Sequence, residues 1–592
     1  MSTTVDPDVP VSGEAESDVI CLDPKLSEKW ALGLRHIGVT AFFALFFLYL
    51  SLQPLFHTDL WGHVAYGKWM LEHRALPTED PYVGYAKGVP VIASAWLGQI
   101  ILALAYQVGG PEGISNLFTL IVWTSYVLLV WAYWWKTRQL GTAMVSMFLA
   151  FFLVWSRHAT VRPEMFATFS FMVLMGVFCW LDHRQGLTSK LNRELSPGSE
   201  DAATPRCGTW RQEVGLAAIV FLTFLFWANS HGSFLVGVVM LSCQAIGRFL
   251  DAAWETRSLS KTIADREAHR WLMLAEVAAI ACLINPYGMD NVINALQFSK
   301  NPNLPDVLEW KVLQFTFVEG VQMCLSWALM LFLYRVSRQP VRLGEVLMLS
   351  ILSVATVLNV RMIGWYGFVY AYAMLPHVAE LGRNTAAWFQ AMFDREHSII
   401  GRVISFRSHK LSIFCLFLAW CGFALSPLGS RMLGAEARKP ARLYSKQTPL
   451  GVTDFLRRHS PHGLIFNPQW WGDWLTWDGP SGVKVFMTTN AVHLAPNRYW
   501  KDYMGLAVGA PNWQKEIDKY NIETFIVHKS DQVKMDVEVR NLPDWKLVYE
   551  DDLAVIMTRD SGLIQSVDAE AKRIAAASTR KVVASTEKPA AR

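Results

Sequence analysis

The chain has 592 residues, of which 52% are hydrophobic, and its formal net charge is only +4. This length excludes a single small domain, and apolar segments that reach the roughly 18–20 residues needed to cross a bilayer recur along most of it. The small, distributed charge gives no sign of nucleic acid as a partner. The 26 tryptophans fit a membrane class, because indole rings gather at membrane interfaces. The composition therefore predicts a polytopic α-helical membrane protein embedded in a lipid bilayer.

Residues 1–34 are polar and acidic, which predicts a cytoplasmic arm ahead of a first span at roughly 36–54. The arm shows no cleavable signal peptide, and the first apolar run is long enough to stay as an anchor. Lys25, Lys29 and Arg35 precede this span, so the positive-inside rule places the N-terminus in the cytoplasm. None of the eight cysteines has metal-site spacing, and redox chemistry is not expected.

Residues 35–430 are expected to form a transmembrane domain. Twelve apolar segments follow one another there, separated by basic loops that mark the cytoplasmic side and by polar breaks with few positive charges. A chain that starts inside and ends outside needs an odd number of spans, so one segment must fail to cross. The segment 93–108 is short and is followed by Gly109, Gly110 and Pro111, and we expect it to lie on the surface or to re-enter the membrane. The prediction is about 11 spans.

The first outer loop, residues 55–92, follows the first span directly. Apolar residues recur in it with helical spacing, which predicts an amphipathic helix along the membrane surface. These residues are Leu60, Val64, Ala65, Trp69 and Leu71. Asp59 and His63 share one face if the helix begins at Asp59. Partial desolvation by aromatic neighbours would make Asp59 a usable base, and the alternative is a helix N-cap worth roughly 1 kcal/mol. Glu79 and Asp80 follow, just ahead of a proline.

Three arginines lie between apolar segments on the predicted outer side, against the positive-inside bias. They are Arg157, Arg162 and Arg361. An unpaired charge at helix depth costs at least about 2.5–3.5 kcal/mol, so each arginine needs a partner. A phosphate or pyrophosphate suits the guanidinium fork. The alternatives are ion pairs, with Glu164 or the first loop for the first two arginines and with Glu309 or Asp306 for the third.

Asn229 and His231 lie where two apolar runs meet with almost no connecting loop. Polar groups held at membrane depth are functional by default, because they must face protein or a wet cavity. Both side chains are therefore candidates for binding a sugar or an acceptor. The alternative is a tight helical hairpin in which Gly232 allows close packing.

From residue 431 the long apolar runs stop and short strand-like runs appear, which predicts an extracytoplasmic α/β domain over 431–560. The predicted strands are 463–467, 483–487, 524–528, 546–549 and 553–557. Helical stretches near 450–459 and 512–520 separate some of them. The final stretch, 561–592, predicts a helix that fades into a flexible tail.

A tryptophan-rich motif opens this domain, with Trp470, Trp471 and Asp473 close together. Aromatic faces beside one carboxylate suit a sugar or peptide ligand. They suit equally the docking of this domain onto the membrane part. No phosphate-cradling glycine loop, zincin motif or nucleophilic serine elbow is present in the sequence.

The order of these features resembles the GT-C glycosyltransferases, which include protein mannosyltransferases, lipid A aminoarabinose transferases and oligosaccharyltransferase catalytic subunits. The likeness is most specific at Asp59-Leu-Trp-Gly-His63 and at Glu79-Asp80-Pro81. The chain also resembles bacterial membrane proteins of this type that carry patterns like Arg162-Pro-Glu164. The stretch Trp470-Trp-Gly-Asp-Trp474 resembles an oligosaccharyltransferase motif in composition, but its Gly precedes the Asp, so no acceptor-binding role is transferred from it.

The resemblance implies transfer of a sugar from a polyprenyl-phosphate donor to an unidentified glycan, lipid or protein acceptor outside a bacterial inner membrane. Asp59 would act as catalytic base, with His63, Glu79 and Asp80 beside it. Arg361 would be a candidate for holding the donor phosphate, which Arg157 and Arg162 are already on the charge argument above. Inversion at the sugar carbon is implied in the same way. Some members use a divalent metal, Mg or Mn, and the residues leave that question open.

Two other functions remain open from the sequence. A polysaccharide polymerase or ligase would take a lipid-diphosphate donor and would depend on arginines rather than on Asp59. A transporter or scaffold without catalysis would place charged residues along a path through the spans, whereas the polar groups here gather at the predicted outer ends.

Overall fold

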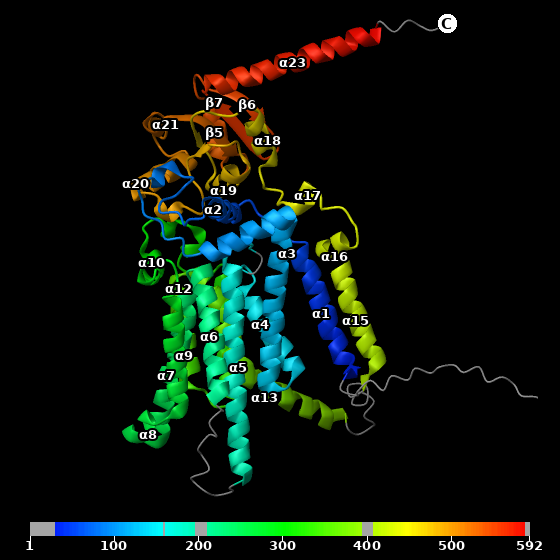
Figure 1. Ribbon diagram of the computed structural model, residues 1–592, viewed down its shortest axis with the longest axis vertical. Coiled ribbons are helices and arrows are strands. Elements are labelled where there is room, and N and C mark those ends of the chain that lie inside the picture. The colour runs from blue at the N-terminus through cyan, green and yellow to red at the C-terminus, as the bar shows by residue number, and fades with distance from the viewer. Residues whose placement is uncertain (1–29, 158–159, 196–209, 394–406, 587–592) are drawn as a thin grey trace, which may run out of the picture.

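The computed structural model describes residues 30–157, 160–195, 210–393 and 407–586 (Figure 1). Most of the predicted N-terminal arm and the end of the predicted tail lie outside these ranges. Within the described residues, a helical bundle carries a smaller domain with a β-sheet at one end, here called the domain end.

The bundle contains five helices that are long and apolar enough to cross a membrane, by length and composition, among the residues that the structure describes. They are α1 (Leu34–Ser51), α3 (Trp96–Thr137), α5 (Glu164–Leu195), α6 (Trp210–Ser230) and α7 (Phe234–Thr256). Shorter apolar helices are α4 (Leu140–Val154), α12 (Leu343–Leu358) and α15 (His409–Ala424). These helices indicate a membrane protein.

The remaining bundle segments complete the helical part. They are α8 (Leu259–Ile263), α9 (Arg266–Cys282), α10 (Met289–Gln297), α11 (Val318–Val336), α13 (Ile363–Phe393), α16 (Pro427–Met432) and α17 (Pro440–Leu443). Each of the twelve predicted apolar segments falls on a helix of the structure. Two short strands, β1 (Leu32–Gly33) and β2 (Arg407–Ser408), pair antiparallel at the opposite end of the bundle from the sheet domain.

Helix α3 is bent at Gly110, where φ is 60° and ψ is −151°. Such a positive φ is readily available to glycine, and Pro111, which follows, cannot donate a backbone hydrogen bond to the preceding turn. The first arm of α3, which contains most of the segment 93–108, lies across the domain end, and the second arm runs along the bundle (Figure 1). The bend therefore turns a continuous apolar sequence into two helices of different direction.

Helix α2 (Leu60–His73) is the predicted amphipathic helix of the first loop. It is clamped rather than laid on a surface, because two glycines allow close approach on two sides. A Cβ added at Gly67 would lie 2.1 Å from the carbonyl oxygen of Gln99 in α3. A Cβ added at Gly62 would lie 2.3 Å from Oδ1 of Asp473 in the sheet domain. Helix α2 is thus held between the first arm of α3 and the C-terminal domain.

The C-terminal domain is built on a five-stranded mixed sheet of order β4-β3-β5-β7-β6. Its strands are β3 (Leu464–Phe466), β4 (Lys484–Val485), β5 (Ile522–His528), β6 (Lys546–Glu550) and β7 (Ala554–Thr558). Strand β3 runs parallel to β4 and β5, and β7 pairs antiparallel with β5 and β6. All five predicted strands are confirmed. The central strands β5 and β7 are the most buried, as expected for strands covered on both faces.

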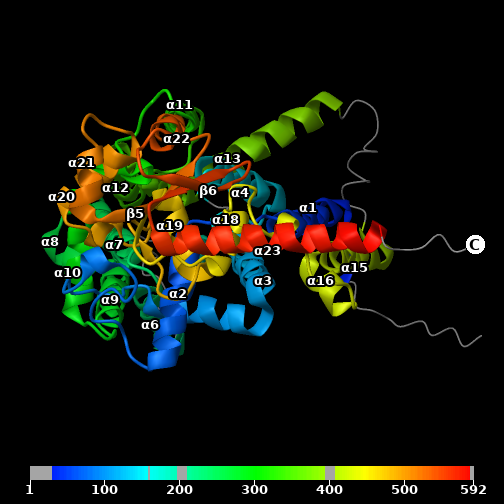
Figure 2. The ribbon, with the colours of Figure 1, turned by 90° about the horizontal axis from the view of Figure 1, so that it is seen from above.

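Helices surround this sheet and connect it to the bundle. They are α18 (Leu450–Arg458), α19 (Gln469–Asp478), α20 (Asn497–Ala507), α21 (Gln514–Tyr520), α22 (Val533–Arg540) and α23 (Ser561–Thr586). The predicted tail thus begins as helix α23. Seen from above, α23 runs from the sheet toward the side of the bundle that α1 and α15 occupy (Figure 2).

Aromatic rings join the two parts of the molecule. Trp474 and Trp477 of α19 lie 4.9 Å and 5.8 Å from the ring of Trp61 in α2. In the segment that leads from the bundle to this domain, the guanidinium of Arg438 contacts both carboxylate oxygens of Glu112 at 2.8 Å and 2.7 Å. The tryptophan-rich motif therefore contributes rings to the docking of the domain.

Candidate functional site

A cavity of about 1250 Å³ lies between the bundle and the C-terminal domain. Helix α2, the connections between bundle helices and the loop that follows strand β4 all contribute to its wall. Several predicted site residues line it, namely Asp59, His63, Asp80, Arg162, His231 and Arg361. Segments separated by more than 400 positions in the sequence therefore meet at one cavity.

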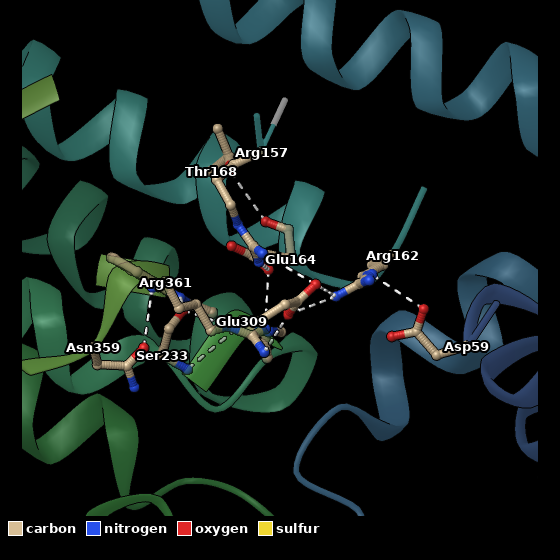
Figure 3. A network of polar contacts seen from close by, with 11 residues as sticks. Asp59, Arg157, Arg162, Glu164, Thr168, Ser233, Glu309, Asn359 and Arg361 are labelled. Atoms are coloured by element: carbon tan, nitrogen blue, oxygen red, sulfur yellow. Dashed lines mark hydrogen bonds and ion pairs between the residues drawn. The ribbon is translucent and has the colours of Figure 1, made fainter. Parts of the chain in front are cut away.

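Three arginines and three carboxylates form a continuous network at one side of this cavity (Figure 3). Nε of Arg162 lies 3.1 Å from Oδ1 of Asp59, and its Nη1 lies 2.9 Å from Oε1 of Glu309. Arg157 contacts Glu164 at 3.0 Å and Glu309 at 3.1 Å. The three formal positive charges are thereby balanced by three negative charges.

Arg361 closes the network from the turn that precedes α13. Its guanidinium lies 3.0 Å from Glu164 and 3.4 Å from Glu309. Burial opposes the ionisation of Glu309, but Arg162 and Arg157 lower its pKa to about 2. Burial likewise disfavours the charged form of Arg162, yet Asp59 and Glu309 raise its pKa above the ordinary value. Glu309 and Arg162 are therefore both ionised at neutral pH.

Asp59 stands at the N-cap position of α2, but its side chain accepts no capping hydrogen bond. It extends instead to Arg162 (Figure 3). Its Oδ1 is buried and has no aligned hydrogen-bond donor, although Nε of Arg162 is within ion-pair distance. The geometry therefore does not show the helix N-cap that the sequence offered as an alternative role. The Asp59 carboxylate can still accept a hydrogen bond from a ligand hydroxyl.

His63 lies one turn further along α2 on the cavity wall. Its Nδ1 lies 3.0 Å from Nε2 of Gln99, an amide nitrogen that can only donate. Burial lowers the pKa of His63 to about 4. The ring is therefore neutral at pH 7, with its proton on Nε2, and serves as a hydrogen-bond donor rather than as a cation.

The two acidic residues at the end of the first loop have different surroundings. Asp80 is buried on the cavity wall and accepts hydrogen bonds from the hydroxyl of Tyr66 and from the backbone N–H groups of Tyr82 and Val83. Burial nevertheless raises the pKa of Asp80. Glu79 is exposed and does not line the cavity; it accepts a hydrogen bond from the backbone N–H of Gly88 at 2.7 Å. Asp80 is thus the acidic neighbour of this site.

Asn229 and His231 also differ in their surroundings, because only His231 lines the cavity. The amide of Asn229 accepts from Trp96 Nε1 at 2.9 Å and donates to the carbonyl oxygens of Leu225 and Ile284. These bonds tie helix α6 to its neighbours. His231 lines the cavity, and its Nδ1 accepts from the backbone N–H of Ser233 at 3.2 Å. Burial lowers the pKa of His231 to about 3, so it too is neutral.

The tryptophan-rich motif lies behind the cavity rather than on its wall. Trp471 is fully buried, and its Nε1 donates to the carbonyl oxygen of Gln447 at 2.9 Å. The rings of Trp470 and Trp471 lie against His528 inside the C-terminal domain. Neither ring is placed to stack on a ligand in this cavity.

Asp473 does not line the cavity itself but holds the loop of Thr489 and Asn490 that does. Its Oδ2 accepts from the backbone N–H groups of Thr489 at 2.8 Å and Asn490 at 3.2 Å, and both of those residues line the cavity. Burial, followed by the negative charge of Asp59, raises the pKa of Asp473 to about 7. The carboxyl group therefore titrates near neutral pH.

Sequence reasoning gave Glu309 and Glu164 only as alternative ion-pair partners, whereas both belong to the network. It did not single out Gln99 or Tyr66 as site residues. Tyr66 carries a signal that could have found it, because it lies seven residues after Asp59 and therefore on the same helix face. No spacing in the sequence identifies Gln99 as a site residue.

The donor set does not fit a divalent cation. Among the described residues, no group of three or more His, Cys, Asp or Glu side chains is arranged to hold a metal ion. The carboxylates on the Asp59 side of the cavity face guanidinium groups, whose charge would repel a cation. The guanidinium groups are the part of this arrangement that suits an anion.

The chain matches no model of a known protein family and none of the curated proteins with which it was compared. Fold and site together define a helical membrane protein with a small sheet domain and, between them, a cavity lined by two arginines and four carboxylates.

Proposed function

We propose that the protein is a GT-C-like glycosyltransferase that moves a sugar from a polyprenyl-phosphate donor to an extracytoplasmic acceptor. The observation that carries this proposal is that Arg162 and Arg361 lie with Asp59 on one wall of a cavity, with Arg157 joined to them through Glu309. In this proposal the protein crosses a bacterial inner membrane about 11 times. Its N-terminus is cytoplasmic, and the sheet domain and the cavity lie outside.

The arginines would bind the phosphate of the donor. A guanidinium group donates two parallel hydrogen bonds to phosphate oxygens and keeps its charge at any physiological pH. Arg162 and Arg361 both line the cavity, and Arg157 supports them from behind through Glu164 and Glu309. As the sugar leaves, negative charge develops on the phosphate oxygen, and fixed cations in a buried site stabilise it.

Asp59 would act as the general base. The acceptor hydroxyl gives its proton to the Asp59 carboxylate, and its oxygen attacks the anomeric carbon of the sugar. The bond from that carbon to the phosphate oxygen breaks, and the electron pair stays with the phosphate. Attack from the opposite side inverts the carbon. The N–H of neutral His63 orients the sugar or the acceptor, and Asp80 with Tyr66 closes the same wall.

Transfer from radiolabelled polyprenyl-phosphate sugars in isolated membranes tests the proposal. We expect Asp59→Asn to lose transfer by about 100-fold or more, the effect of removing a general base. Glu72→Gln is the matched control, since Glu72 lies on the same helix but is exposed and pairs only loosely with Lys68 at 3.8 Å. Transfer retained by Asp59→Asn, with normal expression, removes Asp59 from catalysis.

A lipid-diphosphate-dependent polymerase or ligase is the second candidate, and the same arginine cluster is what favours it. Three guanidinium groups would suffice for two phosphates. That function predicts transfer that survives Asp59→Asn and is lost in Arg361→Ala. Arg361→Ala impairs both candidates, so Asp59→Asn is the variant that separates them.

A further inference from the structure

Glu309 is the only one of the three network carboxylates that contacts all three arginines. Its oxygens lie 3.1 Å from Arg157, 2.9 Å from Arg162 and 3.4 Å from Arg361. Asp59 contacts one of these arginines, and Glu164 contacts two. The carboxylate of Glu309 thus occupies the centre of the cation cluster, where a tetrahedral anion would make the most contacts.

The charge of the cluster depends on this one residue. Three arginines face Asp59, Glu164 and Glu309, so their formal charges cancel. Without Glu309 the cluster keeps one net positive charge. Two of its N–H groups, those on Nε of Arg157 and Nε of Arg162, are buried without an aligned hydrogen-bond acceptor, although Nε of Arg162 is within ion-pair distance of Asp59. The cluster can therefore satisfy an anion with more acceptor oxygens than a carboxylate has.

Glu309 is also the carboxylate best placed to leave. Its side chain is 26% exposed, compared with 12% for Asp59 and 17% for Glu164. It is carried by a one-turn 3₁₀ helix, η6 (Leu308–Trp310), rather than by a bundle helix. A side chain that already reaches solvent can leave the cluster with less rearrangement of its packed neighbours than an enclosed one.

The loop around Glu309 is anchored on both sides. Before it, the amide of Asn303 donates to the carbonyl oxygens of Val492 and Ala495 in the C-terminal domain. After it, the N–H of Leu313 donates to the carbonyl oxygen of Val357 at 3.0 Å. These anchors hold the ends of the segment in place, so exchange at the cluster requires only local movement near Glu309.

We propose that Glu309 holds the place of the donor phosphate: a phosphodiester displaces its carboxylate from Arg157, Arg162 and Arg361, and the cluster stays neutral throughout. The inference rests on the proposed function for the identity of the ligand. A polyprenyl-phosphate sugar is a phosphodiester with one negative charge, so it replaces Glu309 charge for charge. A diphosphate-linked donor brings at least two negative charges and leaves the cluster unbalanced. Glu309 therefore selects the monophosphate class.

Binding of a sugar-free probe to the full-length protein in lipid nanodiscs tests this without any transfer reaction. The probe is farnesyl methyl phosphate, a prenyl phosphodiester, with farnesyl diphosphate as comparison. If Glu309 occupies the cluster most of the time, its removal raises the competent fraction and lowers the apparent Kd. We expect Glu309→Gln to bind the diester about fivefold to tenfold more tightly than the wild type. Glu319→Gln, at a carboxylate that does not line the cavity, should bind like the wild type.

Further variants in the same binding experiment distinguish failure of the displacement by phosphate from failure of the proposed function. Glu309→Asp retains the charge on a shorter side chain and should bind with intermediate affinity, which covers the case in which Glu309→Gln folds poorly. Arg361→Ala should lose binding. An unchanged or weaker affinity in both Glu309 variants, with wild-type binding intact, overturns the displacement and leaves the proposed function standing. No diester binding by the wild type or by either Glu309 variant overturns both.

Two ligand comparisons complete the test. Tighter binding of farnesyl diphosphate than of the diester by the wild type overturns the charge-for-charge selection. Dimethyl phosphate carries the same anion without a lipid chain. If it binds as well as the farnesyl diester, the site belongs to a soluble phosphoester, and the lipid-donor form of the inference is overturned.

Discussion

The close contact between Gly62 and Asp473 leaves no room for the methyl group that Gly62→Ala would add. A Cβ added at Gly62 would lie 2.3 Å from Oδ1 of Asp473 and 3.1 Å from the Cβ of Asn490. Favourable contacts between heavy atoms begin near about 3.5 Å, so the groups must separate by about 1 Å. Asp473 has little freedom to rotate away, because its Oδ2 accepts two backbone hydrogen bonds, at 2.8 Å and 3.2 Å.

Gly62→Ala should therefore destabilise the docking of the C-terminal domain. Overpacking of a close contact costs about 1–3 kcal/mol, and each kcal/mol lowers Tm by about 2–4 °C in a domain of this size. The loss of transfer should be larger, because α2 carries Asp59 and His63, and a displacement of about 1 Å at a reacting group costs on the order of 100-fold in rate. Thermal unfolding and sugar transfer of the purified protein measure the two effects.

Gly38→Ala is the matched control for this variant, since nothing lies within 4 Å of a Cβ added there. It should keep wild-type Tm and transfer. The double variant Gly62→Ala/Asp473→Ala should recover part of the lost Tm, because the clashing oxygen is gone. If Gly62→Ala unfolds and transfers like the wild type, the close packing of α2 against α19 is not what positions Asp59.

Three further predictions concern pH, docking and donor binding. The pKa of Asp473 is about 7 in the folded protein, whereas that of an unfolded Asp is about 4. The free energy of unfolding should therefore fall as the pH rises from about 4 to about 7. Asp473→Asn should flatten the dependence of Tm on pH, and an unchanged slope would contradict the assignment. Arg438→Ala leaves Glu112 without its ion pair and should cost about 2–3 kcal/mol, less than a fully enclosed pair because both side chains keep some exposure. The exposed Arg442→Ala should cost much less, and equal Tm values would argue against the link. Arg361→Ala should raise KM for the donor by about tenfold or more, as expected for a lost charge-assisted contact; a change in kcat alone would place this arginine elsewhere in the reaction.

Secondary structure in this chain follows closely from local sequence. The C-terminal strands were predictable because each is a short run rich in β-branched or aromatic residues between polar stretches, as in β5 (Ile522–His528). Helix α2 was predictable from apolar spacing alone. The number of spans is a different matter, because five helices within the described ranges are long and apolar enough to cross a membrane, whereas the sequence predicted about 11 spans.

The site was predictable only in part, since its geometry depends on contacts that no spacing encodes. The outer arginines and Asp59 attract attention because a charge near a membrane needs a reason. Their pairing with Glu309, which lies 147 residues after Arg162, depends on the packing of the bundle. Trp471 was a candidate ligand platform by composition, but it is fully buried in its own domain. Burial of this kind is a tertiary property and leaves no mark on a single motif.

The clamping of α2 between α3 and α19 has a consequence for how the protein is made. The ribosome synthesises Gly62 about 400 residues before Asp473, which at roughly 5–20 residues per second is a delay of about 20–80 s. At the start of that interval α2 has neither partner, and once α3 (Trp96–Thr137) is made it still lacks the C-terminal domain and the loop that contains Asn490. The cavity therefore closes only when the chain is nearly complete. A chain that ends before residue 469 has the arginines of the network but lacks the part of the cavity wall that the C-terminal domain supplies.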